Sequence, residues 1–142
     1  MPTTIDSTRF GRIEVAPGSA IAFPQGLAGL DSRRFTLVAR AADDAFLWLH
    51  SLEDPALALP VTDPRRFFAE FALAPAAPAG AAIYVTVRAS ERLEDFTANL
   101  RAPLVIVDGI GEQVLNEAPG AELRAPLFAG LAADAAAAER AA

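Results

Sequence analysis

Apolar and polar residues alternate along most of this chain, which is the pattern of strands that bury one face. The clearest example is 82–88, where Ile83, Val85 and Val87 fall on one side. The segment 46–49 is apolar on both sides, as expected of a central strand. Strands are predicted at 12–15, 20–23, 34–40, 46–49, 57–61, 67–73, 82–88, 104–107 and 113–115.

Short, evenly spaced strands separated by turn residues are typical of all-β barrels and sandwiches. We therefore predict an all-β protein, a small closed or partly closed antiparallel β-barrel, formed by a single domain over residues 1–127. Asp108-Gly109-Ile110-Gly111 is predicted to be a hairpin loop, because glycine permits positive φ. Asp43-Asp44 is predicted to be the tip of another hairpin.

Little of the sequence favours helix. Residues 91–96 could form one helical turn, with Ser90 as its cap. The tail 128–142 is rich in alanine, which has the best helix propensity, but a lone helix of that length is marginal in water. We expect this tail to be disordered or a frayed helix, and we expect 74–82, with its prolines and glycine, to be a loop.

The charge and cysteine content narrow the classes of function. The net charge of −6 argues against nucleic-acid binding, which needs a basic face to displace counterions from phosphates. The absence of cysteine fits a reducing compartment. The start of the chain lacks a basic region followed by a long apolar run, so we predict no signal peptide and a cytoplasmic protein.

Side chains of the types that serve as base, nucleophile and acid in catalysis occur close together in the sequence at His50, Ser51 and Asp54. A catalytic triad would need the serine hydroxyl within hydrogen-bond reach of the imidazole. Neighbours on a strand point to opposite faces, so a half-buried histidine satisfied by backbone is favoured over a hydrolase. Asp54, in Glu53-Asp54-Pro55, is predicted to shape a turn.

Metal and phosphate sites are not favoured. The acidic pairs are adjacent residues and bracket no loop with alternating oxygen ligands. The glycine clusters at 26–29 and 109–111 are followed by no lysine and no confident helix, so they are predicted to be tight turns without a cofactor.

Asn99 is the most suggestive polar residue, because it lies directly before a strongly apolar strand that Pro103 can start. Two interpretations stay open. Its amide could satisfy backbone groups of a neighbouring turn, or it could contact a partner at the rim of the barrel.

Five segments follow one another in a recognisable order: FGRIEV at 10–15, IAFPQGLAGL at 21–30, WLHSLEDP at 48–55, VTDP at 61–64 and TANLRAPLVI at 97–106. Among them, Ser-Leu-Glu-Asp-Pro at 51–55 and Asn-Leu-Arg-Ala-Pro at 99–103 are the most specific. From about Phe10 to Leu127 the chain resembles the FliW family, the flagellar assembly factors of bacteria.

The resemblance implies a non-enzymatic barrel that binds newly made flagellin in the cytoplasm and also binds CsrA, a dimeric RNA-binding repressor of flagellin translation. Flagellin would then control CsrA by occupying the protein, which would be a monomer when free. The residues expected to contact partners are Phe23, Pro24, Leu27, Glu53, Asp54, Pro55, Phe96, Thr97, Asn99, Leu100 and Arg101.

The chain departs from the family pattern in three places. His50 stands where Gln is common, Arg101 replaces the usual Lys, and the tail after Leu127 is unusually rich in alanine. Two other hypotheses remain. One is a small-ligand barrel or hydrolase that uses Glu53, Asp54 and His50 in a deep pocket. The other is a structural β-module that oligomerises through a strand edge.

Overall fold

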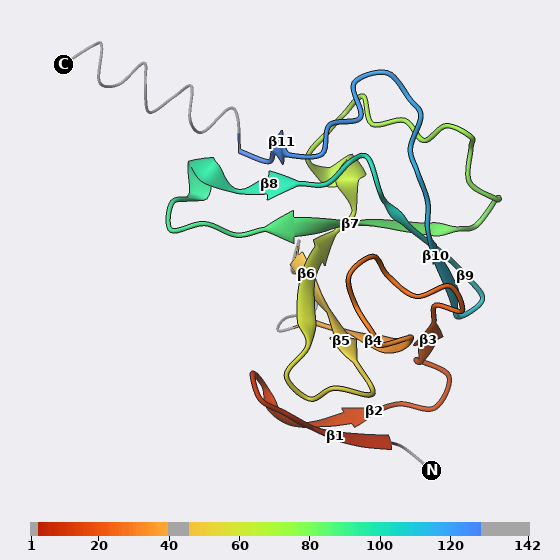
Figure 1. Cartoon of the computed structure of the whole chain (residues 1–142), viewed down its shortest axis with the longest axis vertical. Helices are drawn as coiled ribbons and strands as arrows, with labels where there is room; N and C mark the ends of the chain where they lie inside the picture. Colours follow the sequence, from red (N-terminus) through yellow and green to blue (C-terminus); the bar gives the residue numbers. More distant parts are fainter. Residues whose placement is uncertain (1–2, 40–45, 129–142) are drawn as a thin grey trace.

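Strands make up nearly all the regular structure in the computed structural model, which describes residues 3–39 and 46–128 (Figure 1). The strands and two short 3₁₀ helices are β1 Thr3–Ser7, β2 Gly11–Val15, β3 Ile21–Ala22, β4 Arg34–Val38, β5 Phe46–Ser51, β6 Ala58–Thr62, η1 Pro64–Arg66, β7 Ala82–Arg88, η2 Leu93–Asp95, β8 Thr97–Ala98, β9 Leu104–Val107, β10 Ile110–Gln113 and β11 Ala125–Pro126. The predicted all-β fold is confirmed.

The barrel closes because β7 pairs on both sides. The strands run in the order β7-β6-β5-β4-β3-β10-β9, and Ala82–Tyr84 of β7 pair with Leu104–Ile106 of β9 to complete the ring. The pairs within the ring are antiparallel except β3 with β10, which is parallel at Ala22 and Ile110. The expectation of a purely antiparallel barrel is therefore wrong at this one pair.

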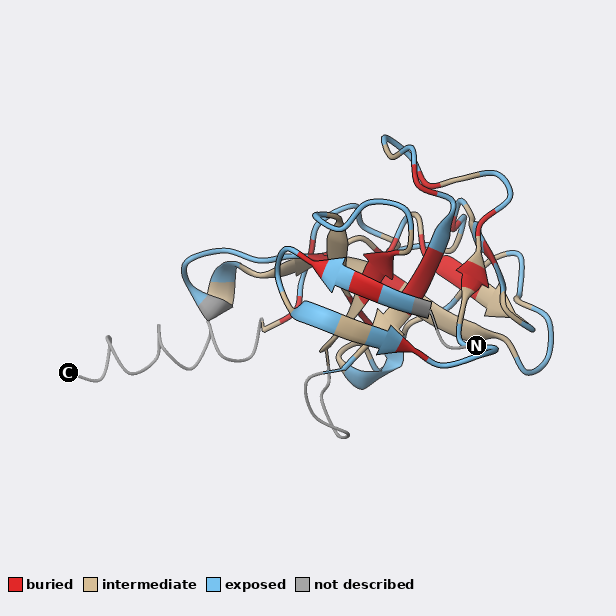
Figure 2. Cartoon of the chain, turned by 90° about the horizontal axis from the view of Figure 1, so that it is seen from below, coloured by how far each residue is buried: buried red, intermediate tan, exposed pale blue. Residues whose placement is uncertain are grey.

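Two additions extend the barrel. The far end of β7 pairs with β8, and β8 pairs with β11, which gives a three-stranded flap beyond the ring. The hairpin of β1 and β2 forms its own two-stranded sheet below the barrel (Figure 1). Seen from below, buried and exposed residues alternate along this hairpin (Figure 2).

The apolar side chains form two clusters. The barrel cluster fills the ring and contains Ile21, Phe23, Leu27, Phe35, Leu49, Val61 and Leu104. The flap cluster lies under β7, β8 and β11 and contains Val85, Val87, Ala98, Leu100, Ala125 and Leu127. Six phenylalanines pack around it, and among them Phe46 stacks on Phe67 with ring centroids 5.4 Å apart. β7 lines both clusters, because Tyr84 packs on the first and Val85 belongs to the second. β5 also reaches both, through Leu49 in the barrel cluster and Phe46 against the flap cluster.

The predicted strand at 67–73 is wrong. Asp63 accepts a hydrogen bond from the Arg65 amide at 3.0 Å and caps η1, which begins at Pro64. An acidic cap followed by proline is the normal start of a helical turn. The chain then continues in turns that deliver Phe67, Phe68 and Phe71 to the flap cluster.

Other boundaries differ by a few residues. The strand expected at 113–115 is β10, Ile110–Gln113, because Asp108 and Gly109 alone make the hairpin turn, with φ of 50° and 78°. The turn expected at 91–96 is η2, and 74–82 is the expected loop up to the start of β7. β1 has no counterpart among the predicted strands. The expected hairpin tip at Asp43-Asp44 and the tail from 129 onward lie outside the described residues.

Over residues 3–39 and 46–128 there is no helix long and apolar enough to cross a membrane.

Candidate functional site

The turn after β5 is held by the side chains of its own residues. The Ser51 hydroxyl is buried and accepts hydrogen bonds from the amides of Glu53 and Asp54, both at 2.9 Å, while donating to Ser32. The Asp54 carboxylate accepts from the Ala56 amide at 2.9 Å. Each polar group here shapes the turn, as predicted for Asp54, and leaves Glu53, Asp54 and Pro55 exposed.

Glu53 fastens this turn to the start of β4. Its Oε1 accepts from the amides of Arg33 at 2.6 Å and Arg34 at 3.0 Å. These two backbone hydrogen bonds hold the pKa of the Glu53 carboxyl below its usual range. The Arg33 guanidinium in turn donates to the carbonyl of Pro24 at 2.9 Å. The structure thus brings together two of the expected contact segments, 23–27 and 53–55.

His50 is fully buried and bonded at both ring nitrogens. Nδ1 lies 2.8 Å from the Ser51 carbonyl, which can only accept, so Nδ1 carries the hydrogen. Nε2 therefore accepts from the Ser7 hydroxyl at 2.7 Å. The imidazole points away from the Ser51 hydroxyl and the acids, so His50, Glu53 and Asp54 do not converge as a hydrolase site would require.

The turn after β3 is only partly exposed to solvent. Phe23 is 0% exposed, and its ring meets that of Phe35 edge-on at 5.6 Å. Leu27 is also buried in the barrel cluster. Pro24 and its neighbour Gln25 are exposed, so a partner could reach these two side chains without a rearrangement.

The segment 96–101 carries Asn99 in a turn. Asn99 Oδ1 accepts from the amides of Arg101 and Ala102, both at 3.1 Å, so the amide does satisfy a neighbouring turn. Its Nδ2 makes no hydrogen bond within the described chain. Leu100 is buried, Phe96 and Thr97 are half-buried, and Arg101 is exposed.

Gln113 joins this segment to the turn after β3. Its Oε1 accepts from the Ala28 amide at 3.0 Å, and its Nε2 donates to the Ala102 carbonyl at 3.4 Å. All three expected contact segments are therefore linked, in the order 53–55, 33–34, 24–28, 113 and 99–102. We call this chain of linked segments the turn surface.

Asn116 is a buried polar residue that the sequence analysis missed. Its Oδ1 accepts from the amides of Ala74 and Ala118, and its Nδ2 donates to the carbonyls of Ala72 and Leu100, at 2.9–3.1 Å. Every hydrogen-bonding position of the amide is thus used. A lone Asn three residues beyond the end of β10 gives no sequence signal for this role.

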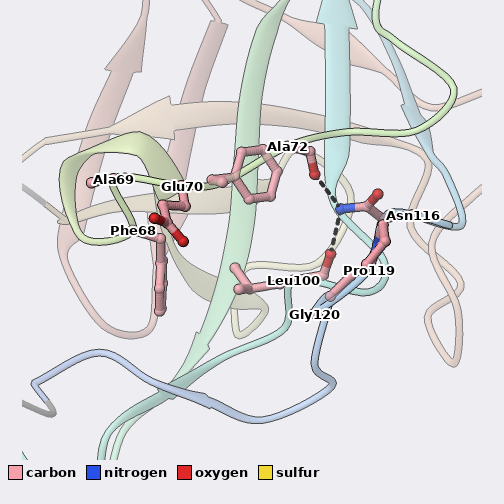
Figure 3. Close-up of a pocket in the computed structure, with 10 residues that line it drawn as sticks. Phe68, Ala69, Glu70, Ala72, Leu100, Asn116, Pro119 and Gly120 are labelled. Atoms are coloured by element: carbon pink, nitrogen blue, oxygen red, sulfur yellow. Dashed lines mark hydrogen bonds between the residues drawn. The ribbon is translucent and has the colours of Figure 1, made fainter.

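A cavity of about 480 Å³ lies beside Asn116 (Figure 3). Phe68, Leu100 and Gly120 line the cavity, and Glu70 contributes a carboxylate to its lining. Because the Asn116 amide is already saturated by backbone groups, it has no hydrogen-bonding position left for a ligand in this cavity. Among the described residues no cluster of three or more His, Cys, Asp or Glu is placed to hold a metal ion.

The arrangement defines a small β-barrel protein that offers turns, and no convergent reactive groups, on its described surface. The family model of the FliW protein matches residues 4–127, and the chain belongs to the FliW family.

Individual relatives agree with this assignment. The chain is 34% identical to the flagellar assembly factor FliW of Bdellovibrio bacteriovorus over 72% of its length, and the match spans 65% of that protein. It is 30% identical to the flagellar assembly factor FliW 2 of Desulfotalea psychrophila, over 84% of the chain and 87% of that protein. A crystal structure of the flagellar assembly factor FliW superposes with a TM-score of 0.78 at 26% identity, over 89% of this chain and 97% of that one. An assembly factor has a non-enzymatic role.

Proposed function

We propose that this protein is a cytoplasmic flagellar assembly factor that binds flagellin and the translational repressor CsrA. Flagellin occupies the protein while it accumulates in the cell. When flagellin is exported, the freed protein binds CsrA and translation of flagellin resumes.

The observation that carries this proposal is the family match over residues 4–127. The turn surface supports it, because Pro24, Glu53 to Pro55, and Arg101 are exposed on turns that hydrogen bonds hold rigid. A rigid surface loses little conformational entropy on binding. The net charge of −6 favours fast association with a basic partner at low salt.

The experiment that tests the proposal is a competition between the two partners. Purified flagellin is titrated into a preformed complex of the full chain with labelled CsrA, and the release of CsrA is followed by fluorescence anisotropy. We expect stoichiometric release of CsrA and a complex of the chain with flagellin on size-exclusion chromatography. Failure of either partner to bind at micromolar concentration would contradict the proposal.

The competing hypothesis of a hydrolase or small-ligand barrel predicts that His50, Glu53 and Asp54 meet in one pocket. Instead, His50 is bonded to Ser7 and to backbone, and the two acids are bonded to separate backbone amides. The contacts of these three side chains therefore favour the binding protein.

A further inference from the structure

The outer face of the flap carries two exposed arginines, Arg88 and Arg124. In the register of β7, β8 and β11, Val87, Ala98 and Ala125 are paired, and all three point into the flap cluster. Residues that flank them along each strand must point outward, because side chains alternate across a strand. The outward set is Thr86, Arg88, Thr97, Asn99 and Arg124, and together with Val87 and Leu123 it lines a shallow cavity of about 250 Å³.

Neither arginine has an acidic partner within residues 3–39 and 46–128. The guanidinium groups of Arg88 and Arg124 make no ion pair and no hydrogen bond within the described part of the chain, and both residues are exposed. Asn99, in the turn directly after β8, has an Nδ2 that is likewise an unused donor within the described residues. Donors without an acceptor therefore gather on one face of a protein whose net charge is −6.

The spacing of the two cations suits a peptide. Arg88 pairs with Thr97, and continuing the β8–β11 register puts Arg124 opposite Asn99. Two strand spacings and an offset of two residues put the two Cα atoms about 12 Å apart. Carboxylates four residues apart in an extended chain are separated by about 13 Å. Leu123, which is 58% exposed and lines the same cavity beside Arg124, offers an apolar contact to such a segment.

We propose that this face, which we call the arginine face, binds an acidic segment of another polypeptide, with one carboxylate on Arg88 and another on Arg124. Asn99 Nδ2 donates a further hydrogen bond to the segment. The proposal deepens the proposed function and rests on it in one respect, namely that the segment 96–101 meets a partner.

A polypeptide fits better than a nucleic acid. Exposed acids flank the face, with Glu91 and Asp95 in the connection between β7 and β8, and Glu122 just before Arg124. A phosphate backbone carries charge continuously along its length and would meet these acids. A peptide with two isolated carboxylates would not bring charge close to these acids.

Addition of the peptide as a further strand beside β11 is also disfavoured, because Pro126 lacks the amide that such pairing needs.

The test is an NMR titration of the full chain with a short synthetic peptide that has two glutamates four positions apart and a leucine between them. A matched peptide has glutamine at both positions. We expect the Nε–Hε signals of Arg88 and Arg124 and the side-chain amide of Asn99 to shift with the glutamate peptide, with about tenfold tighter binding than the glutamine peptide and a loss of affinity in high salt.

Two double variants complete the design. R88Q/R124Q keeps most of each side chain and should abolish the preference for glutamate. R12Q/R66Q removes the same charge from exposed arginines elsewhere and should retain it. Thermal unfolding by circular dichroism checks that both variants fold.

Three outcomes would overturn the inference. The first is that the chain binds both peptides equally well or binds neither of them. The second is that both double variants lose affinity for the glutamate peptide to the same extent. The third is that an oligothymidylate of similar length binds more tightly than the glutamate peptide. This titration needs neither flagellin nor CsrA. A protein that binds the glutamate peptide but neither partner would disprove the proposed function and leave the arginine face established.

Discussion

The Ser7 hydroxyl donates a hydrogen bond to Nε2 of His50 at 2.7 Å and so ties the β1–β2 hairpin to the wall of the barrel. The same hydroxyl accepts from the amides of Arg9 and Phe10, at 3.2 and 3.1 Å. Around it, Phe10 packs edge-on against Trp48 at 5.5 Å, and the Arg9 guanidinium lies 4.5 Å from the centre of the Trp48 ring. The Thr8 amide adds a hydrogen bond to the Pro55 carbonyl at 2.9 Å. The hairpin is thus held on the barrel by hydrogen bonds at Ser7 and Thr8 and by the aromatic contacts of Phe10 and Arg9 with Trp48.

We predict that Ser7→Ala lowers the free energy of unfolding by about 1–3 kcal/mol, because it leaves buried Nε2 without a donor and two amides without an acceptor. Urea denaturation followed by Trp48 fluorescence measures this. The control is Ser90→Ala at an exposed site, which should change stability by less than about 0.5 kcal/mol. Equal effects of the two substitutions would show that the Ser7–His50 bond contributes nothing specific.

Asn116→Ala should be among the most destabilising polar substitutions, at about 3 kcal/mol, since it leaves backbone groups of three segments unpaired at once. Denaturant titration measures the loss. Asn116→Asp is a sharper comparison, because it keeps the two acceptor bonds of Oδ1 and loses the two donor bonds to the carbonyls of Ala72 and Leu100. A stability of either variant equal to wild type would disprove the tethering role.

The two roles of Asn99 can be separated by a pair of substitutions. Asn99→Asp keeps the oxygen that accepts from Arg101 and Ala102, but loses the Nδ2 donor. Asn99→Ala loses both groups and should cost about 1 kcal/mol of stability. If Asn99 contacts a partner through Nδ2, both variants bind more weakly while Asn99→Asp keeps its melting temperature. Unchanged affinity per folded molecule in both would assign Asn99 to the turn alone.

Gly111 is required by its contact with a ring. A Cβ added at Gly111 would overlap the Cε1 and Cζ atoms of Phe23 in the barrel cluster. Gly111→Ala should therefore destabilise the protein by about 1–3 kcal/mol through overpacking. The double variant with Phe23→Leu should recover part of that loss in a double-mutant cycle. Additive effects in the cycle would contradict the steric explanation.

The turn surface should loosen in acid. The pKa of Glu53 is lowered in the folded protein by the amides of Arg33 and Arg34, so its stabilising contribution is complete above its ordinary pKa of about 4.3 and is lost as pH falls through the folded value. Glu53→Gln keeps an acceptor oxygen and does not titrate. Wild type should thus lose stability relative to Glu53→Gln as pH falls below about 5. Melting curves from pH 7 to 3 test this, and parallel curves for the two proteins would refute it.

Much of the barrel could be predicted from the sequence, because alternation directly reports which residues face the core. The segment 82–88 matches β7 residue for residue. Alternation misled at 67–73, where Phe67 and Phe71 are spaced as in a strand but Asp63-Pro64 begins a 3₁₀ turn. The parallel pairing of β3 with β10 joins residues 22 and 110, and no local pattern encodes a contact at that separation.

The candidate site was predicted only in part. The turns at 53–55 and 99–102 could be identified because Asp, Asn and Pro have known turn chemistry. Their connection through Gln113 could not be predicted, because an amide on a strand edge bonds to whatever backbone tertiary packing brings near it. The outward set on the flap was missed because Arg88 and Arg124 are 36 residues apart and meet only through β8.

The sharing of β7 between the ring and the flap has a mechanical consequence. Ala82–Tyr84 of β7 hold the seam with β9, and Val87 and Arg88 of the same strand hold β8, so the ring and the flap share one backbone segment. Because the two hydrophobic interiors are joined in this way, we expect the molecule to melt in one cooperative step.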